Sequence, residues 1–227
     1  MMMSTDIVGY WYRAPQEAIV LIHQAALEMF SLAGGNGTIF DSGMVLNYDL
    51  HESPTSQHWM SGTISARICV RWFTSHSFTN CFIFSPRHDL VRLIMGWWRD
   101  LACRAGDTSL SFEPVRFDLA KIVSFAESTK TLRGIHFIHT DVITTMTTYS
   151  VFRCKQIAPF LQLPRLLRND EEICWCLVHV GARWDCTIRD RWFELDAGDL
   201  NAEHLLDETY VFACHLIELA TRSNAIP

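Results

Sequence analysis

The sequence EEICWCLVHVGARWDCTIRDRWFELD, residues 171–196, reads as two strands joined by a tight turn at residues 181–183. The first strand has hydrophobic side chains on both of its faces, which is typical of a central strand covered on both sides. In the second strand, Trp184, Cys186 and Ile188 alternate with polar residues, as in a sheet with one face in water. The stretch therefore predicts an antiparallel hairpin within a larger sheet.

Segments with the period of a strand and segments with the period of a helix follow one another along the rest of the chain. The predicted strands are residues 7–12, 44–50, 64–72, 78–84, 108–117 and 134–139. The predicted helices are residues 15–33, 86–105, 118–129 and 199–221, each introduced by a proline or a capping side chain. We therefore expect an α+β fold, in which a mostly antiparallel sheet packs against N-terminal, middle and C-terminal helices.

The chain shows no internal repeat and no linker, so residues 1–227 are predicted to form a single α+β domain. Residues 140–170 have the weakest pattern, with five threonines followed by Pro159 and Pro164. They suggest an irregular crossing with a strand near Val151 and a turn of helix near Phe160. A domain boundary near residues 140–170 is the alternative.

The predicted middle helix presents a choice for one of its tryptophans. Leu90, Ile94, Trp97 and Leu101 recur at helical spacing and form the expected buried stripe. Neighbouring residues on a helix cannot both face inward, so Trp98 either is covered by another element or belongs to a contact surface.

Composition and targeting features limit the class of protein. With 49% hydrophobic and 19% charged residues, the chain is typical of a globular protein. Its formal net charge of −6 argues against non-specific binding to nucleic acid or to an anionic membrane. We expect no signal peptide, because the first residues lack a basic segment followed by an apolar run. We expect no membrane span, because no window approaches roughly 18 consecutive apolar residues. The cytoplasm is therefore the predicted location.

The charged residues are unevenly distributed along the chain. Residues 1–168 contain 13 acidic and 15 basic residues, whereas residues 169–227 contain 12 acidic and 4 basic ones. An acidic surface of this kind attracts a basic protein partner, although a solvated face that keeps the protein soluble is the alternative reading. The predicted partner-binding residues are Asp185, Asp190, Glu203, Asp207 and Glu208.

Histidines and cysteines are the candidate metal ligands and nucleophiles of the chain. His136, His139 and Asp141 could bind a metal, but His136 and His139 point to opposite faces of a strand, which favours a structural role. The eight cysteines lie in apolar patterns and the chain has no CxxC motif, so Cys174, Cys176 and Cys186 are predicted to be reduced, buried thiols rather than zinc ligands. No catalytic residue, metal or cofactor is predicted.

The beginning of the chain carries a family resemblance. The sequence IVGYWYRAPQEA, residues 7–18, resembles the start of bacterial polymorphic-toxin immunity proteins, where a strand runs into an amphipathic helix. The strand pair at residues 64–84 that leads into the Leu/Trp-rich helix at residues 90–101 is also similar, and together these parts cover about a third of the chain. The resemblance implies a cytoplasmic protein that binds a cognate toxin domain, often a nuclease, and blocks it without catalysis.

These observations favour a cytosolic inhibitor. The leading hypothesis is an immunity protein that neutralises a basic, nuclease-type toxin by covering its active site with an acidic C-terminal surface. One alternative is a small hydrolase or transferase with its site near residues 136–141. Another is a non-catalytic subunit of a larger assembly, which would leave Trp98 and the apolar edge strands exposed.

Overall fold

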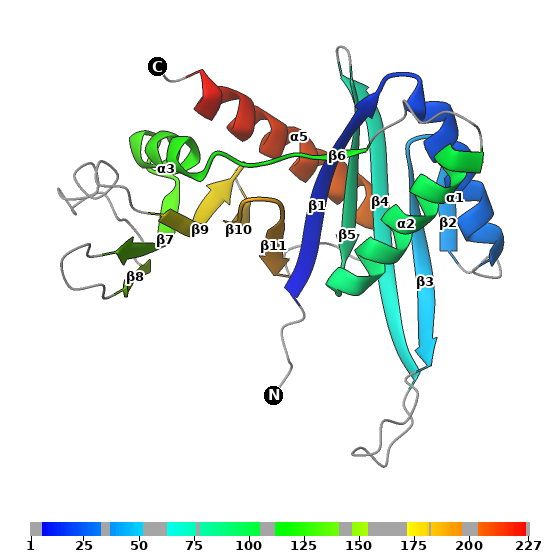
Figure 1. The fold of residues 1–227 in the computed structure, drawn as a ribbon, viewed down its shortest axis with the longest axis horizontal. Coiled ribbons are helices and arrows are strands. Elements are labelled where there is room, and N and C mark those ends of the chain that lie inside the picture. The colour runs from blue at the N-terminus through cyan, green and yellow to red at the C-terminus, as the bar shows by residue number, and fades with distance from the viewer. Residues whose placement is uncertain are drawn as a thin grey trace. The chain divides into compact units, whose positions relative to one another are not determined.

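The computed structural model describes residues 6–32, 37–51, 63–75, 78–104, 112–140, 147–153, 172–181, 183–196 and 204–225. Two compact units are present (Figure 1). The N-terminal unit comprises Thr5–Val115 and Ala202–Thr209; the C-terminal unit comprises Arg116–Asn201 and Tyr210–Pro227, together with Met1–Ser4. The predicted α+β fold with a mostly antiparallel sheet is confirmed, while the single domain stays a prediction. A boundary near 140–170 falls largely on residues 141–146 and 154–171, outside the described residues.

The N-terminal unit contains a sheet covered by two helices. Its strands are β1 (Asp6–Pro15), β2 (Gly37–Phe40), β3 (Gly43–His51), β4 (Thr63–Ser75), β5 (Phe78–Ser85) and β6 (Glu113–Pro114). They pair antiparallel in the order β2-β3-β4-β5-β1, and β6 also pairs with β1. Helices α1 (Ala18–Leu32) and α2 (His88–Arg104) pack on one face, where Met44, Val70 and Ile83 are buried (Figure 1). The predicted strands at residues 7–12, 44–50, 64–72 and 78–84 and both predicted helices are therefore confirmed. Of the strand predicted at residues 108–117, only β6 is present, and residues 105–111 lie outside the described part of the chain.

Trp98 is part of the core of this unit. Only 1% of its surface is exposed, and its ring lies 5.1 Å from that of Phe112. The buried stripe of α2 is Leu90, Ile94, Trp98 and Ala102, a spacing of four residues throughout. The side chains of Trp97 and Leu101, which we expected in that stripe, lie outside the described part of the structure. Trp98 is thus covered, which removes one of the two conditions for the subunit alternative.

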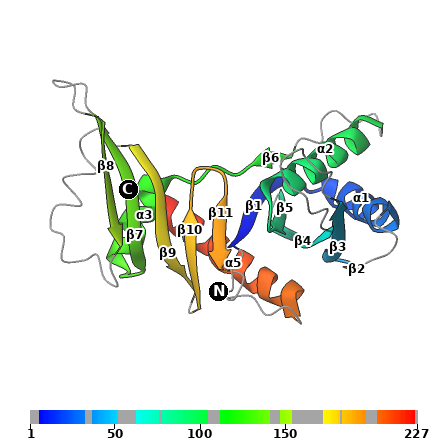
Figure 2. The same ribbon diagram turned by 90° about the horizontal axis from the view of Figure 1, so that it is seen from below.

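The C-terminal unit contains the hairpin predicted at residues 171–196. Its strands are β7 (Leu132–Thr140), β8 (Thr147–Arg153), β9 (Glu172–Val180), β10 (Trp184–Ile188) and β11 (Phe193–Asp196). They pair antiparallel in the order β11-β10-β9-β7-β8 (Figure 2). The predicted hairpin is β9–β10, and β8 is the strand expected near Val151.

Two details of this hairpin differ from the prediction. First, only one face of β9 is fully buried, because Cys176 and Val178 are inaccessible while Trp175 and Leu177 are half-buried. Second, a further strand that was not predicted follows the hairpin. The backbone N–H of Arg189 donates to the carbonyl of Trp192 at 2.9 Å, closing a turn that returns the chain as β11.

Two helices cover the buried face of this sheet. Helix α3 (Leu119–Ser128) begins at the predicted cap, where the carboxylate of Asp118 accepts a 3.1 Å hydrogen bond from the backbone N–H of Lys121. Helix α5 (Leu205–Asn224) has its first residues in the N-terminal unit and the remainder here. Phe212 lies against Trp184 and Phe193, with ring centroids 5.7 and 5.3 Å apart. The helix buries one stripe of side chains, Leu205, Phe212, Leu216 and Leu219.

Candidate functional site

Two of the predicted partner-binding residues lie in the C-terminal unit and already have local partners. Asp185 on β10 lies opposite His179 on β9, and its Oδ1 is 2.8 Å from Nδ1 of the imidazole. Asp190 lies in the turn after β10, where its Oδ2 accepts a hydrogen bond from Nε of Arg191 at 3.3 Å. The two carboxylate side chains are 57% and 59% exposed, so both remain accessible to a partner.

The other predicted partner-binding residues lie at or before the start of α5. This first part of the helix, up to Thr209, belongs to the N-terminal unit. Asp207 and Glu208 are in the first helical turn, where the positive end of the helix dipole stabilises a carboxylate. Asp207 is exposed and Glu208 is half-buried, while Glu203 lies outside the described residues. The structure therefore places the described acids in two separate groups, one on the hairpin and one on the helix.

Folding redistributes the charge that is segregated along the sequence. The C-terminal unit contains 12 acidic and 12 basic residues, because the basic segment 116–168 joins the acidic hairpin. The N-terminal unit, including residues 202–209, contains 13 acidic and 7 basic residues and so carries the whole net charge of −6. The carboxylates around Asp207 therefore lie in an acidic unit, whereas those of the hairpin lie in a unit without net charge.

The histidines considered as metal ligands are only partly described. The ring of His136 stacks on Trp175 across β7 and β9, with centroids 5.6 Å apart and planes inclined by 12°. His139 also lies on β7, and Asp141 lies outside the described residues. In the described ranges, no three His, Cys, Asp or Glu side chains are grouped so that they could hold a metal ion. A catalytic site near residues 136–141 stays a prediction.

Burial makes four of the cysteines poor nucleophiles. It raises the pKa of Cys69 and Cys176 to about 12, and the pKa of Cys81 and Cys186 well above the ordinary range. A thiol with such a pKa is protonated at neutral pH, and the thiolate is the reactive form. All seven described cysteines are free, and Cys154 lies outside the described residues. These four thiols are therefore packing groups.

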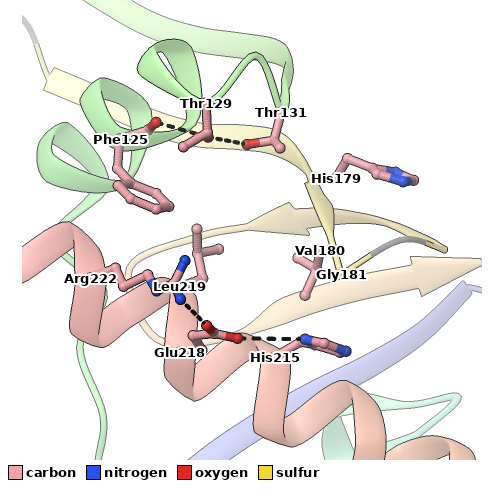
Figure 3. A pocket seen from close by; sticks show the side chains of 10 residues that line it. All are labelled: Phe125, Thr129, Thr131, His179, Val180, Gly181, His215, Glu218, Leu219 and Arg222. Carbon is pink, nitrogen blue, oxygen red and sulfur yellow. Dashed lines mark hydrogen bonds and ion pairs between the residues drawn. The ribbon is translucent and has the colours of Figure 1, made fainter.

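An open groove in the C-terminal unit combines polar and apolar side chains (Figure 3). We call it the α3–α5 groove; its volume is about 180 Å³. One wall is the end of α3 with Thr129 and Thr131, and the other is the face of α5 with His215, Glu218 and Arg222 (Figure 3). The remaining lining residues are Phe125, His179, Val180, Gly181 and Leu219.

Each wall of the groove has its own set of polar contacts. On α5, a carboxylate oxygen of Glu218 is 2.6 Å from a guanidinium nitrogen of Arg222 and the other is 3.7 Å from Nδ1 of His215. On the α3 side, the hydroxyl of Thr129 lies 3.0 Å from the carbonyl oxygen of Phe125 and 2.9 Å from the hydroxyl of Thr131 (Figure 3). The backbone N–H of His179 donates to the carbonyl of Thr131 at 2.8 Å, which fixes this loop against β9.

The groove has only a weak signal in the amino-acid sequence. Residues 215, 218 and 222 are spaced three and four apart, which places them on one face of a helix. Charged residues at this spacing usually form ion pairs on the surface of a helix. They line a groove here only because α3 and the turn at Gly181 lie close to this face of α5. In the described part of the chain, no helix is both long and apolar enough to cross a membrane.

The chain matches no model of a known protein family and no curated protein sequence. The similarity of its beginning to immunity proteins therefore stays a prediction.

Proposed function

We propose that the protein is a cytosolic, non-catalytic inhibitor that binds a basic protein partner. Its most concrete form is an immunity protein that covers the active site of a basic, nuclease-type toxin domain. The observation that carries this proposal is the net charge of −6 in the N-terminal unit, where Asp207 lies exposed in the first turn of α5. Excess negative charge around an exposed carboxylate attracts a cationic cleft and speeds association.

The hairpin group supports the same function through a different effect. Asp185 and Asp190 lie in a unit with no net charge, so they add little long-range attraction. They can act only at short range, by pairing with arginine or lysine side chains of a docked partner. An exposed ion pair contributes roughly 0.2–1 kcal/mol, so several carboxylates must act together to give measurable affinity.

The experiment compares two sets of charge reversals. The wild-type chain is used to purify its partner from the native host, and the purified partner is then titrated with each variant. Glu203→Lys with Asp207→Lys is the helix set, and Asp185→Lys with Asp190→Lys is the hairpin set. Asp100→Lys with Glu113→Lys is the matched control, because both residues are exposed in the N-terminal unit and the change in charge is the same.

We expect the helix set to weaken binding by about 1–2 kcal/mol and to slow association, with the loss shrinking at high salt. The hairpin set should act mainly on dissociation. The control changes the net charge of the same unit, so it should slow association to a smaller extent than the helix set and leave dissociation unchanged. A partner without a basic surface would refute the proposal. So would equal losses in the control and in both sets, because the carboxylates would then only keep the protein soluble. Failure of the bound partner to lose activity would refute inhibition.

A further inference from the structure

We propose that the α3–α5 groove binds a small monocarboxylate with an apolar body. The groove lies in the C-terminal unit and is lined only by residues of that unit. The inference goes beyond the proposed function and does not rest on it.

The open hydrogen-bonding groups on the α5 wall are mainly donors. Arg222 carries five N–H donors in a planar fork, and one nitrogen is paired with Glu218 at 2.6 Å. Its side chain is 64% exposed, and among the described residues it has no second hydrogen-bonding partner. His215 lies 3.7 Å from Glu218, beyond hydrogen-bond distance. A ligand that supplies acceptor oxygens fits this wall, and a carboxylate matches the geometry of a guanidinium fork.

The charge of the same wall limits the ligand to one negative charge. Glu218 lies between Arg222 and His215 on the face of α5, and it is half-exposed. A phosphate dianion would double both the repulsion from that carboxylate and the attraction to Arg222, whereas the cost of removing the ion from water grows with the square of its charge. The opposite wall gives no compensation, since the hydroxyl protons of Thr129 and Thr131 are used within the α3 turn. A monoanion is therefore favoured over a dianion.

The floor of the groove explains why the ligand should have an apolar body. Val180 and Leu219 are 2% and 9% exposed, and Phe125 is half-buried beside them. A cavity of roughly 150 Å³ can hold benzene, so a volume of about 180 Å³ suits a phenyl ring or a short alkyl chain. These three side chains would cover that body while the carboxylate faces α5.

The ring of His215 is held in place before any ligand arrives. Its ring lies against the backbone of Gly181, where an added Cβ would come within 2.9 Å of His215 Cδ2. On another side, the ring centroid lies 6.1 Å from that of Trp184. Because the ring is packed in this way, binding need not order it, which lowers the entropic cost of association.

The test uses the full chain with hexanoate and benzoate as probes, and with hexylamine and inorganic phosphate as comparisons. We expect both carboxylates to bind with a dissociation constant on the order of 1 mM, as their small size allows. Amide resonances of Thr129–Thr131, Gly181 and His215–Arg222 should shift on titration, and those of the N-terminal unit should not. Hexylamine and phosphate should bind at least tenfold more weakly.

Three variants assign the affinity to individual side chains. Arg222→Gln should weaken hexanoate binding about tenfold, as expected for loss of a charge-assisted hydrogen bond. Glu218→Gln should strengthen it severalfold, because the repelling charge is gone. Arg191→Gln is the matched control, as Arg191 also pairs with a surface carboxylate but lies outside the groove; it should bind as the wild type does.

Several outcomes would overturn the proposal. One is that neither carboxylate shows saturable binding at a ligand concentration about ten times the expected dissociation constant. Others are equal binding of hexylamine or phosphate, or resonance shifts outside the groove. Weaker binding in Glu218→Gln would show that the site prefers a cation. If circular dichroism shows that Arg222→Gln does not fold, the Glu218→Gln variant alone decides whether the groove favours a negatively charged ligand.

Discussion

Gly181 combines two constraints that only a residue without a side chain meets. Its φ of +63° lies in the left-handed region, and a Cβ would approach His215 Cδ2 to 2.9 Å. Left-handed backbone costs a non-glycine residue about 1–2 kcal/mol. The sequence indicated the turn because glycine interrupts two hydrophobic strands, but it did not indicate the contact with α5, which depends on packing.

We therefore expect Gly181→Ala to lower the free energy of unfolding by about 1–3 kcal/mol, measured by urea denaturation. Gly96→Ala is the matched control: this glycine lies in α2, and a Cβ there would have no atom within 4 Å. That variant should raise the free energy of unfolding by about 0.5–1 kcal/mol, since alanine favours a helix. Equal effects of the two substitutions would contradict this account of Gly181.

At the scale of an element, α3 shows which features the sequence predicted and which it did not. Its start at Asp118 was predicted, because a capping carboxylate acts on a backbone N–H only three residues away. Its end was placed correctly near Thr129, although glycine, the usual signal, is absent. The turn at residues 189–192, which returns the chain as β11, was not predicted, because it contains neither glycine nor proline.

The end of α3 contains a strained residue. Lys130 has a φ of +60°, and the flanking hydrogen bonds run from the N–H of Lys130 to Glu127 and from the N–H of Thr131 to Ala126. This is the pattern of a helix that ends in a left-handed residue, a position usually held by glycine. We expect Lys130→Gly to raise the free energy of unfolding by about 0.5–1 kcal/mol.

Lys121→Gly is the comparison for this prediction, since it introduces the same residue inside the helix. It should lower the free energy of unfolding by roughly 0.5–1 kcal/mol. In urea denaturation, the two substitutions should change the free energy of unfolding in opposite directions if Lys130 is strained, and in the same direction if it is not.

For the whole molecule, the charge pattern along the sequence was a poor guide to the charge of the fold. Acidic residues at positions 170–199 are folded together with the basic residues of segment 116–168, and the unit they share has no net charge. Periodicity predicted the elements well because it depends on neighbours along the chain. Surface charge and the α3–α5 groove depend on which segments meet, and the sequence pattern contains no such information.

Stability at alkaline pH is a property of the whole molecule as well. Burial raises the pKa of Cys69 and Cys176 to about 12 and places the pKa of Cys81 and Cys186 well above its ordinary value. In the unfolded chain the thiols ionise near pH 8.5, so above that pH the unfolded state binds fewer protons than the folded one. The free energy of unfolding must then fall as pH rises from about 8.5 to 12, by up to about 1.4 kcal/mol per pH unit for each thiol.

Four such thiols acting together give a fall of about 5 kcal/mol per pH unit, which is comparable to the total stability of a typical protein. We therefore expect urea denaturation between pH 8 and 10.5 to show a steep loss of stability and unfolding without denaturant near the upper limit. Cys176→Ala should lower the stability at pH 8 but reduce the slope by about a quarter, because one ionising thiol is gone. Cys103→Ala is the control, since this cysteine is exposed. A slope that is the same in Cys176→Ala and in the wild type would show that the buried thiols do not govern alkaline unfolding.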